Sequence, residues 1–274
     1  MESSGCSRST SGRRRGVTVL EVQGLSKLFG GITAVNNVSL SVDEGRIVSL
    51  VGPNGAGKTT LFAMVAGFQK PDAGTVHFEG QDITGLKPHR ICARGMVRTF
   101  QVTQPFATLS TLENIMVGAY RNTADRRSAS ARATAVANRV GMGAMLEQPA
   151  EGLTVAGRKR LELARALATE PRLLLLDEVI AGLNPAEIDE IVEVIKGIRD
   201  SGVTIFLIEH VMKAVMSLSD YTYVLNDGVL IAEGTPSEIA SNPDVVEAYL
   251  GHGAAERMIG HGASLIRTQR DDNA

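Results

Sequence analysis

The sequence predicts an α/β fold built around a phosphate-binding loop (P-loop), with an antiparallel β subdomain and an inserted α-helical subdomain. Three observations predict it. The glycine-rich stretch 52–60 lies between the apolar run 47–51 and the helix formers of 61–66. The run 173–176 is four consecutive leucines, which is typical of a strand buried on both faces of a parallel sheet. Residues 111–169 carry helix signals and no strand signal.

Composition limits the classes of function. The chain has 274 residues, enough for one large domain or a domain with a subdomain. Its net charge of −2 implies no general affinity for nucleic acid. The two cysteines, Cys6 and Cys92, lie far apart without metal-ligand spacing, which suits a reducing compartment. No apolar run approaches the roughly 20 residues of a membrane span. We therefore expect a protein that is soluble by itself and reaches a membrane only through partners.

The two ends of the sequence differ from its middle. Residues 1–16 contain four arginines among serine and glycine and no apolar segment, so we expect a disordered basic arm and not a secretory signal. Strand-like sequence begins at Val17. Residues 252–274 show no clear periodicity and are expected to form a loosely held tail. The folded domain should therefore span about 17–251, with a helical subdomain at about 102–169.

Short strands are expected before the glycine-rich stretch, at 17–22, 25–29 and 38–42. The last alternates apolar and polar residues, as a half-exposed antiparallel strand does. Phe29 ends the second strand, just before a Gly-Gly turn. An aromatic side chain at this position could stack on a base, or it could be an ordinary core or surface residue.

The glycine-rich stretch has the residues that a phosphate requires. Glycine backbones can turn amide N–H groups inward to form an anion nest, and the following helix points its positive end at the same place. Lys58 would add a mobile charge for the β- and γ-phosphates, and the Thr59 hydroxyl could bind Mg²⁺. The predicted nucleotide-binding residues of this loop are Gly52, Pro53, Asn54, Gly55, Ala56, Gly57, Lys58, Thr59 and Thr60.

Turns and short elements follow the loop helix. We expect a turn at 71–74, a strand at 75–78, a further turn at 79–82, a helix at 88–94 that ends at Gly95, and a strand from Met96 to Phe100. Gln101 then stands at a strand end. Its amide could touch Mg²⁺ or an attacking water, or it could simply be solvated.

Two stretches within 111–169 predict helices with capped starts. Thr111 resembles the capping residue of a helical region that runs to about Val140, and its arginines indicate a solvated face. A second helix, to about Ala168, opens at Leu153, Thr154, Val155, Ala156 and Gly157. Thr154 would cap it, and its N-terminus is a potential anion site.

Two more predicted strands end in polar residues. Asp177 and Glu178 follow the leucine strand, at the end where α/β sheets bind ligands. Asp177 is placed to hold Mg²⁺, and Glu178 to orient or deprotonate the water that attacks a γ-phosphate. His210 follows the strand 203–208 and could sense that phosphate or be structural.

The remaining segments are expected to be regular. They are a loop at 181–185, a helix that begins at Pro185, a helix at 211–218, a hairpin around 226–228, and short helices at 236–241 and 244–250.

Taken in order, these motifs resemble the ATP-binding subunits of ABC transporters, over about 17–251. Three motifs look like the importer branch for branched-chain amino acids. They are Phe-Gly-Gly-Ile-Thr-Ala-Val-Asn-Asn-Val at 29–38, Val-Arg-Thr-Phe-Gln at 97–101 and Glu-His-Val-Met-Lys at 209–213. The segments 233–236 and 247–251 look like it as well. The sibling that the chain resembles is the first of that system's two ATPases. The lipopolysaccharide-export ATPase is related, but its glutamine segment normally differs.

The resemblance implies roles for individual residues. Phe29 would stack on adenine, Gln101 would couple Mg²⁺ to the transport-domain contact, and His210 would be the switch histidine. The segment that follows Gln101, to about Leu112, would receive a coupling helix of the permease. The loop Gly182, Leu183 and Asn184 would lie between subunits.

The sequence departs from the family pattern at two places. The signature is usually Leu-Ser-Gly-Gly-Gln, whereas residues 153–157 read Leu-Thr-Val-Ala-Gly. In the family this segment caps the γ-phosphate of the opposite subunit. Asn184 stands where many members have Asp, which bears on the water network between subunits.

The resemblance therefore implies an ATPase that uses ATP and Mg²⁺ to drive solute import. Its partners would be transmembrane permease subunits, a second ATPase that is a sibling or another copy, and indirectly a solute-binding protein. It would act at the cytoplasmic face of the plasma membrane, with no nucleic-acid partner. Two alternatives stay open. One is a non-transport ABC ATPase acting on DNA or ribosomes, and the other is a regulatory ATP-binding subunit with weakened turnover.

Overall fold

The fold consists of two β-sheets and a set of helices. It is known from a computed structural model that describes residues 16–99 and 104–250. Most of the predicted arm, the predicted tail and Gln101 lie outside the described residues. No helix within those two ranges is long and apolar enough to cross a membrane.

An antiparallel sheet is formed mainly by the residues that precede the glycine-rich loop. Its strand order is β2-β1-β4-β5. The bounds are Thr18–Phe29 for β1, Ile32–Asp43 for β2, Ala73–Phe78 for β4 and Gln81–Asp82 for β5. The two strands predicted within 17–29 are one strand with register shifts, and β2 begins earlier than expected because it pairs along the whole of β1. The turn predicted at 79–82 contains β5, a two-residue strand that pairs with β4.

A six-stranded sheet forms the centre of the molecule, in the order β10-β9-β3-β8-β7-β6. The bounds are Ile47–Val51 for β3, Met96–Arg98 for β6, Leu173–Asp177 for β7, Thr204–Ile208 for β8, Tyr221–Asn226 for β9 and Val229–Gly234 for β10. Every residue of β3, β7 and β8 is buried, as strands covered on both faces require. These three strands pair in parallel, so their carboxyl ends share one edge.

The helices follow most of the predicted ranges. They are α1 (Lys58–Val65), α2 (Pro88–Ala93), α3 (Thr111–Ala119), α4 (Arg126–Arg139), α5 (Val155–Leu167), α6 (Pro185–Asp200), α7 (Met212–Leu218), α8 (Pro236–Ala240) and α9 (Pro243–Leu250). Helix α1 begins three residues earlier than the predicted start, so Lys58 and Thr59 lie in its first turn. Thr154 caps α5 as predicted.

Two further boundaries differ from the sequence-based expectation. Ser110, and not Thr111, caps α3, because Ser110 forms a capping box with Glu113. The Thr111 hydroxyl instead donates to the Gln148 carbonyl at 3.1 Å, which ties α3 to the segment before α5. Strand β6 ends at Arg98 and is shorter than the strand predicted to end at Phe100.

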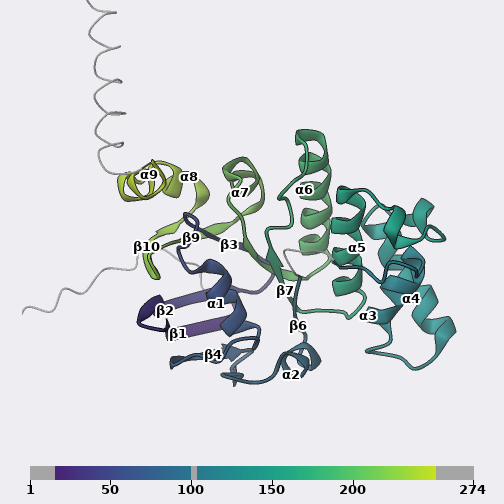
Figure 1. Cartoon of the computed structure of the whole chain (residues 1–274), viewed down its shortest axis with the longest axis horizontal. Coiled ribbons are helices and arrows are strands. Elements are labelled where there is room, and N and C mark those ends of the chain that lie inside the picture. Colours follow the sequence, from purple (N-terminus) through teal and green to yellow (C-terminus); the bar gives the residue numbers. More distant parts are fainter. Residues whose placement is uncertain (1–15, 100–103, 251–274) are drawn as a thin grey trace, which may run out of the picture.

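The helices divide between the two faces of the central sheet. Helix α1 packs with the antiparallel sheet against one face, in a core that includes Leu20, Phe62 and Phe206. Helices α3 to α7 contribute to a second core on the other face. Helices α3, α4 and α5 gather at one end of the molecule, beyond α6 (Figure 1). The glycine-rich loop and the helical part therefore lie on different sides of β7.

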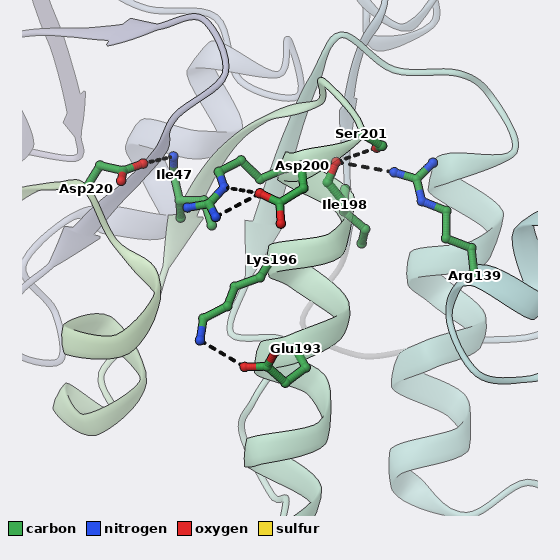
Figure 2. A network of polar contacts seen from close by, with 9 residues as sticks. Ile47, Arg139, Glu193, Lys196, Ile198, Asp200, Ser201 and Asp220 are labelled. Atoms are coloured by element: carbon green, nitrogen blue, oxygen red, sulfur yellow. Dashed lines mark hydrogen bonds and ion pairs between the residues drawn. The ribbon is translucent and has the colours of Figure 1, made fainter.

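The C-terminal end of helix α6 is joined by a hydrogen bond to α4 of the helical part (Figure 2). The Arg139 guanidinium, from the last turn of α4, donates to the Ile198 carbonyl at 3.2 Å, and the Ser201 hydroxyl donates to the same oxygen at 2.6 Å. A cation at a helix C-terminus is favoured by the helix dipole. Nearby, the Asp220 carboxylate accepts from the amide of Ile47 at 2.8 Å and fixes the start of β3.

A buried tyrosine is one of the links between the two sheets. Tyr223, on β9, is 1% exposed, and its hydroxyl donates to the Ser41 carbonyl of β2 at 3.0 Å. The same hydroxyl accepts from the Ser41 amide at 3.1 Å. The antiparallel sheet is thus fixed to the sheet that carries the glycine-rich loop.

We expect Tyr223→Phe to lower the free energy of unfolding by about 1–3 kcal/mol, because it removes a buried hydroxyl that makes two backbone hydrogen bonds. Urea denaturation would measure the change. Tyr120→Phe is the matched control: Tyr120 is 43% exposed, and its substitution should change stability by less than about 0.5 kcal/mol. Equal stabilities for the two variants would contradict this role for Tyr223.

Candidate functional site

The glycine-rich loop follows β3 and is held by close backbone contacts. Gly52 has φ 153°, and a Cβ at this position would lie 2.0 Å from the Leu225 carbonyl oxygen. Gly57 has φ 100°, and a Cβ there would lie 2.2 Å from the Ala34 carbonyl oxygen. Both positions therefore require glycine for conformation and for space. Gly55 has φ 83°, and a Cβ at that position would meet nothing within 4 Å, so the middle of the loop is open.

Lys58 points back into this loop from the first turn of α1. Its Nζ donates to the carbonyl oxygens of Gly52 at 2.7 Å and Pro53 at 2.9 Å, and the residue is 6% exposed. Burial lowers the pKa of the Lys58 ammonium, while the nearby carboxylates of Glu178 and Asp177 act to raise it. Lys58 is thus a buried cation between the loop backbone and two carboxylates, and its carbonyl partners could be exchanged for anionic oxygens.

Asp177, at the end of β7, is the best-placed residue for a cation. It is 2% exposed, and its Oδ2 accepts from the Arg98 guanidinium at 2.6 Å. Its Oδ1 is buried and has no hydrogen-bond partner among the described residues. Carboxylate and hydroxyl oxygens are ligands that Mg²⁺ prefers. The unsatisfied Oδ1 suits a Mg²⁺ ion, and Thr59, an exposed residue in the first turn of α1, carries a hydroxyl of the kind that Mg²⁺ also binds.

Glu178 leaves β7 in an unusual backbone conformation. Its φ is 48°, in the left-handed region that non-glycine residues rarely adopt. Its side chain is 17% exposed, and one carboxylate oxygen lies 4.0 Å from Nδ1 of His210, whose side chain is 48% exposed. Two of the residues that the sequence singled out at separate strand ends thus lie side by side at one edge of the sheet.

Two buried charged residues beside Glu178 were not predicted as functional. Glu209 is 1% exposed, and its Oε1 accepts from the amide of Ile180 at 3.0 Å. Lys159, on α5, is 7% exposed, and its Nζ donates to the Glu178 carbonyl at 3.1 Å. Burial raises the pKa of Glu209 to about 7; the Glu178 charge adds to the rise, and backbone hydrogen bonds and Lys159 oppose it. A carboxylate directly before a strand-end histidine was the available sequence signal.

The start of α5 is open to a partner. The Thr154 hydroxyl accepts from the Gly157 amide at 3.1 Å, and Val155 is 56% exposed. The Arg158 guanidinium donates to the Leu153 carbonyl at 3.1 Å and to that of Glu151 at 3.0 Å, which fixes the turn before the helix. An exposed helix N-terminus whose preceding turn is held in place can bind an anion.

Three other predicted segments have simpler surroundings. Phe29 lies at the end of β1, is 45% exposed, and carries the Lys27 ammonium 5.5 Å from its ring centroid. Asn184 caps α6 by accepting from the amides of Ala186 and Glu187 at 3.0 Å. Gly182, in the same loop, has φ 81° and open space around it, whereas Leu183 packs against the core.

This arrangement defines a nucleotide-binding α/β protein, since a glycine loop, a buried lysine and two strand-end carboxylates converge at one sheet edge. Comparison with known proteins narrows the class. Residues 35–181 match the family model described as ABC transporter. Residues 229–255 match a model described as branched-chain amino acid ATP-binding cassette transporter.

Individual relatives match over nearly their whole length. The high-affinity branched-chain amino acid transport ATP-binding protein BraF of Pseudomonas aeruginosa is 43% identical over 249 residues, or 85% of this chain and 98% of the relative. LivG of Salmonella typhimurium, which has the same description, is 44% identical with the same coverage. The chain therefore belongs to the ABC transporter family of ATP-binding proteins.

Solved structures agree with this assignment. A nucleotide-free ATP-binding cassette of an ABC transporter superposes with a TM-score of 0.79 at 31% identity, covering 86% of this chain and 100% of that one. A cassette in its ADP conformation superposes equally well, at 0.79 and 32% identity, with the same coverage. The predicted ABC ATPase fold is thus confirmed.

We expect the stability of the protein to depend on pH through Glu209. Its pKa is raised to about 7 in the folded state, so the folded protein keeps a proton that the unfolded chain releases. Stability is therefore lost as pH rises from about 4.5 to 7, and the loss is complete above that range. Glu209→Gln removes this titration and keeps an acceptor for Ile180. The free energy of unfolding of the variant, relative to that of the wild type, should therefore rise by about 3 kcal/mol from pH 4.5 to pH 8. Urea denaturation at both pH values would measure the gain, and a stability difference that does not change with pH would contradict it.

Proposed function

We propose that this protein is the ATP-hydrolysing subunit of an ABC importer that takes up branched-chain amino acids or a similar small solute. The observation that carries the proposal is the convergence of Lys58, Asp177 and Glu178 at one edge of the central sheet. The printed names of the relatives, which are branched-chain amino acid transport ATP-binding proteins, support the solute class.

ATP would bind along the glycine loop. The loop amides and the start of α1 would receive the β-phosphate, and Lys58 would exchange its carbonyl partners for the β- and γ-phosphate oxygens. The exposed ring of Phe29 would stack on adenine. Thr59, Asp177 and Gln101 would hold Mg²⁺. When bound, Mg²⁺ supplies charge neutralisation on the phosphate oxygens.

Hydrolysis would depend on Glu178. The γ-phosphoryl transfer needs an oriented water more than covalent chemistry from the protein. Glu178 would orient that water and accept its proton. His210, whose Nδ1 lies 4.0 Å from the Glu178 carboxylate, would contact the γ-phosphate.

A second ATPase subunit would complete the site. The start of α5, with Leu153, Thr154, Val155, Ala156 and Gly157, would face the γ-phosphate bound by the partner. The Thr154 cap and the helix dipole retain the anion-binding character of the usual signature despite Ala156 and Gly157. The loop with Gly182, Leu183 and Asn184 would lie at the same interface. The family resemblance favours a sibling ATPase as the partner over a second copy.

Transport subunits would bind beside the segment that follows Gln101. A groove of about 210 Å³ lies there between β6, α3 and α5, with Val97, Val117 and Arg165 in its lining. Arg165 also lies 5.0 Å from the centroid of the exposed Phe106 ring. An apolar groove with a charged rim suits a short helix of a permease. The protein would then be peripheral at the cytoplasmic face of the plasma membrane, and a solute-binding protein would act indirectly.

The regulatory alternative is an ATP-binding subunit without turnover. The signature segment of this chain, residues 153–157, differs from the usual one at several positions. Lys58, Glu178 and His210 are nevertheless all present, which favours an active enzyme. Isolation of the protein in a complex with its permease subunits would test the proposed assembly.

We expect Glu178→Gln to lower kcat for ATP hydrolysis by about 10²-fold or more, which is the contribution of a general base. The KM for ATP should stay within about twofold, because the loop that binds phosphate is unchanged. Glu193→Gln, on the exposed face of α6, is the control and should hydrolyse ATP at the wild-type rate. A steady rate that Glu178→Gln leaves unaffected would refute the assignment of the base.

Thr154→Ala tests the partner-facing helix start. Loss of a capping hydroxyl costs about 1 kcal/mol, so we expect a small loss of stability together with a lower ATPase rate. Thr154→Ser keeps the hydroxyl and should keep most of the activity. The ATPase rate at saturating ATP, compared with melting temperature, is the measurement. Equal rates for the alanine and serine variants would rule out a role for this hydroxyl.

A further inference from the structure

The backbone of Glu178 is held in its left-handed conformation by contacts from neighbouring segments. A non-glycine residue with φ 48° persists only where the surroundings over-determine it. The Glu178 amide donates to the Ile208 carbonyl at 3.0 Å. Its carbonyl accepts from Nζ of Lys159 at 3.1 Å and from the amide of Ala181 at 3.3 Å. These contacts fix the direction in which the Glu178 side chain leaves the strand.

Lys159 differs from the other contacts because it comes from a distant helix. It lies on the second turn of α5, in the helical part of the chain, whereas the other donors and acceptors lie on or next to the central sheet. Lys159 is 7% exposed, and a buried ammonium is costly unless it is well satisfied. Replacing buried ionic groups with hydrophobic residues is often neutral or stabilising in proteins, so the charge points to a role beyond packing.

The same helix begins at Thr154. Helix α5 is a rigid element, so a displacement of its N-terminus also moves Lys159, which is one turn further along. Lys159 therefore connects the surface proposed to face the partner's nucleotide with the backbone of this chain's own Glu178. Glu209 also supports this loop, through the amide of Ile180, and the Lys159 charge favours its ionised form.

We propose that Lys159 is a positioning residue for ATP hydrolysis, which holds the Glu178 backbone so that its carboxylate faces the attacking water. It would transmit the seating of α5 against a partner's nucleotide to the base of its own site. This inference rests on the proposed function and adds a residue to it.

The test compares Lys159→Met and Lys159→Arg in the full chain. Methionine fills the space without donating a hydrogen bond, and arginine restores a cationic donor. We expect kcat to fall about tenfold in Lys159→Met while the KM for ATP stays within about twofold, because only the water-orienting group is disturbed. Arginine should recover most of the lost rate. Lys196→Met, which removes a lysine of α6 whose side chain is 34% exposed, is the matched control and should not change the rate.

A second background separates positioning from general loss of structure. Since Lys159 acts through Glu178, Lys159→Met should lower the residual single-turnover rate of Glu178→Gln by less than about twofold, so the two effects are not additive. An equal loss in both backgrounds, or no loss in the wild-type background, would overturn the proposal. Failure of the proposed function is distinguishable, because the wild type would then hydrolyse no ATP or Glu178→Gln would be fully active.

Discussion

The parallel register of three buried strands is the constraint on which the rest of the structure depends. Ile208 of β8 is aligned with Leu50 of β3 on one side and with Asp177 of β7 on the other. The residues that follow these three positions must therefore emerge at one edge of the sheet. This pairing brings together the glycine loop, the carboxylates and His210, although Gly52 and His210 are more than 150 positions apart in the sequence.

The candidate site is energetically costly because it buries charged side chains. Lys58, Lys159, Asp177 and Glu209 are all nearly inaccessible to solvent, and burial shifts the pKa of Lys58 down and that of Glu209 up. One oxygen of Asp177 lacks a hydrogen-bond partner within the described part of the chain. Buried charges of this kind destabilise the empty protein. A bound nucleotide with its cation would supply the missing partners, so ligand binding and stability should be linked.

Local motifs made much of the fold predictable. The glycine loop, the leucine strand and the Thr154 cap each have a signal within a few residues, and each is present in the structure. Errors arose where longer contacts decide. Ser110 displaced Thr111 as a cap because a reciprocal bond with Glu113 satisfies two backbone groups. The contact between Lys159 and Glu178 could not be predicted from the sequence. Lys159 donates to a backbone carbonyl, and every residue type has one, so the residue at position 178 gives no signal of this bond. The roles that depend on the family resemblance, such as those of Phe29 and Gln101, stay predictions.

The central claim is that two ATPase subunits close around ATP, with the glycine loop of one opposite the Thr154 segment of the other. The most direct measurement is the mass in solution of the Glu178→Gln chain, which should bind ATP without consuming it, with and without Mg-ATP. It should be made on the chain alone and with its companion ATPase. We expect a paired species that forms only with nucleotide and dissociates when the nucleotide is removed. A chain that binds ATP yet stays single in both mixtures would contradict it.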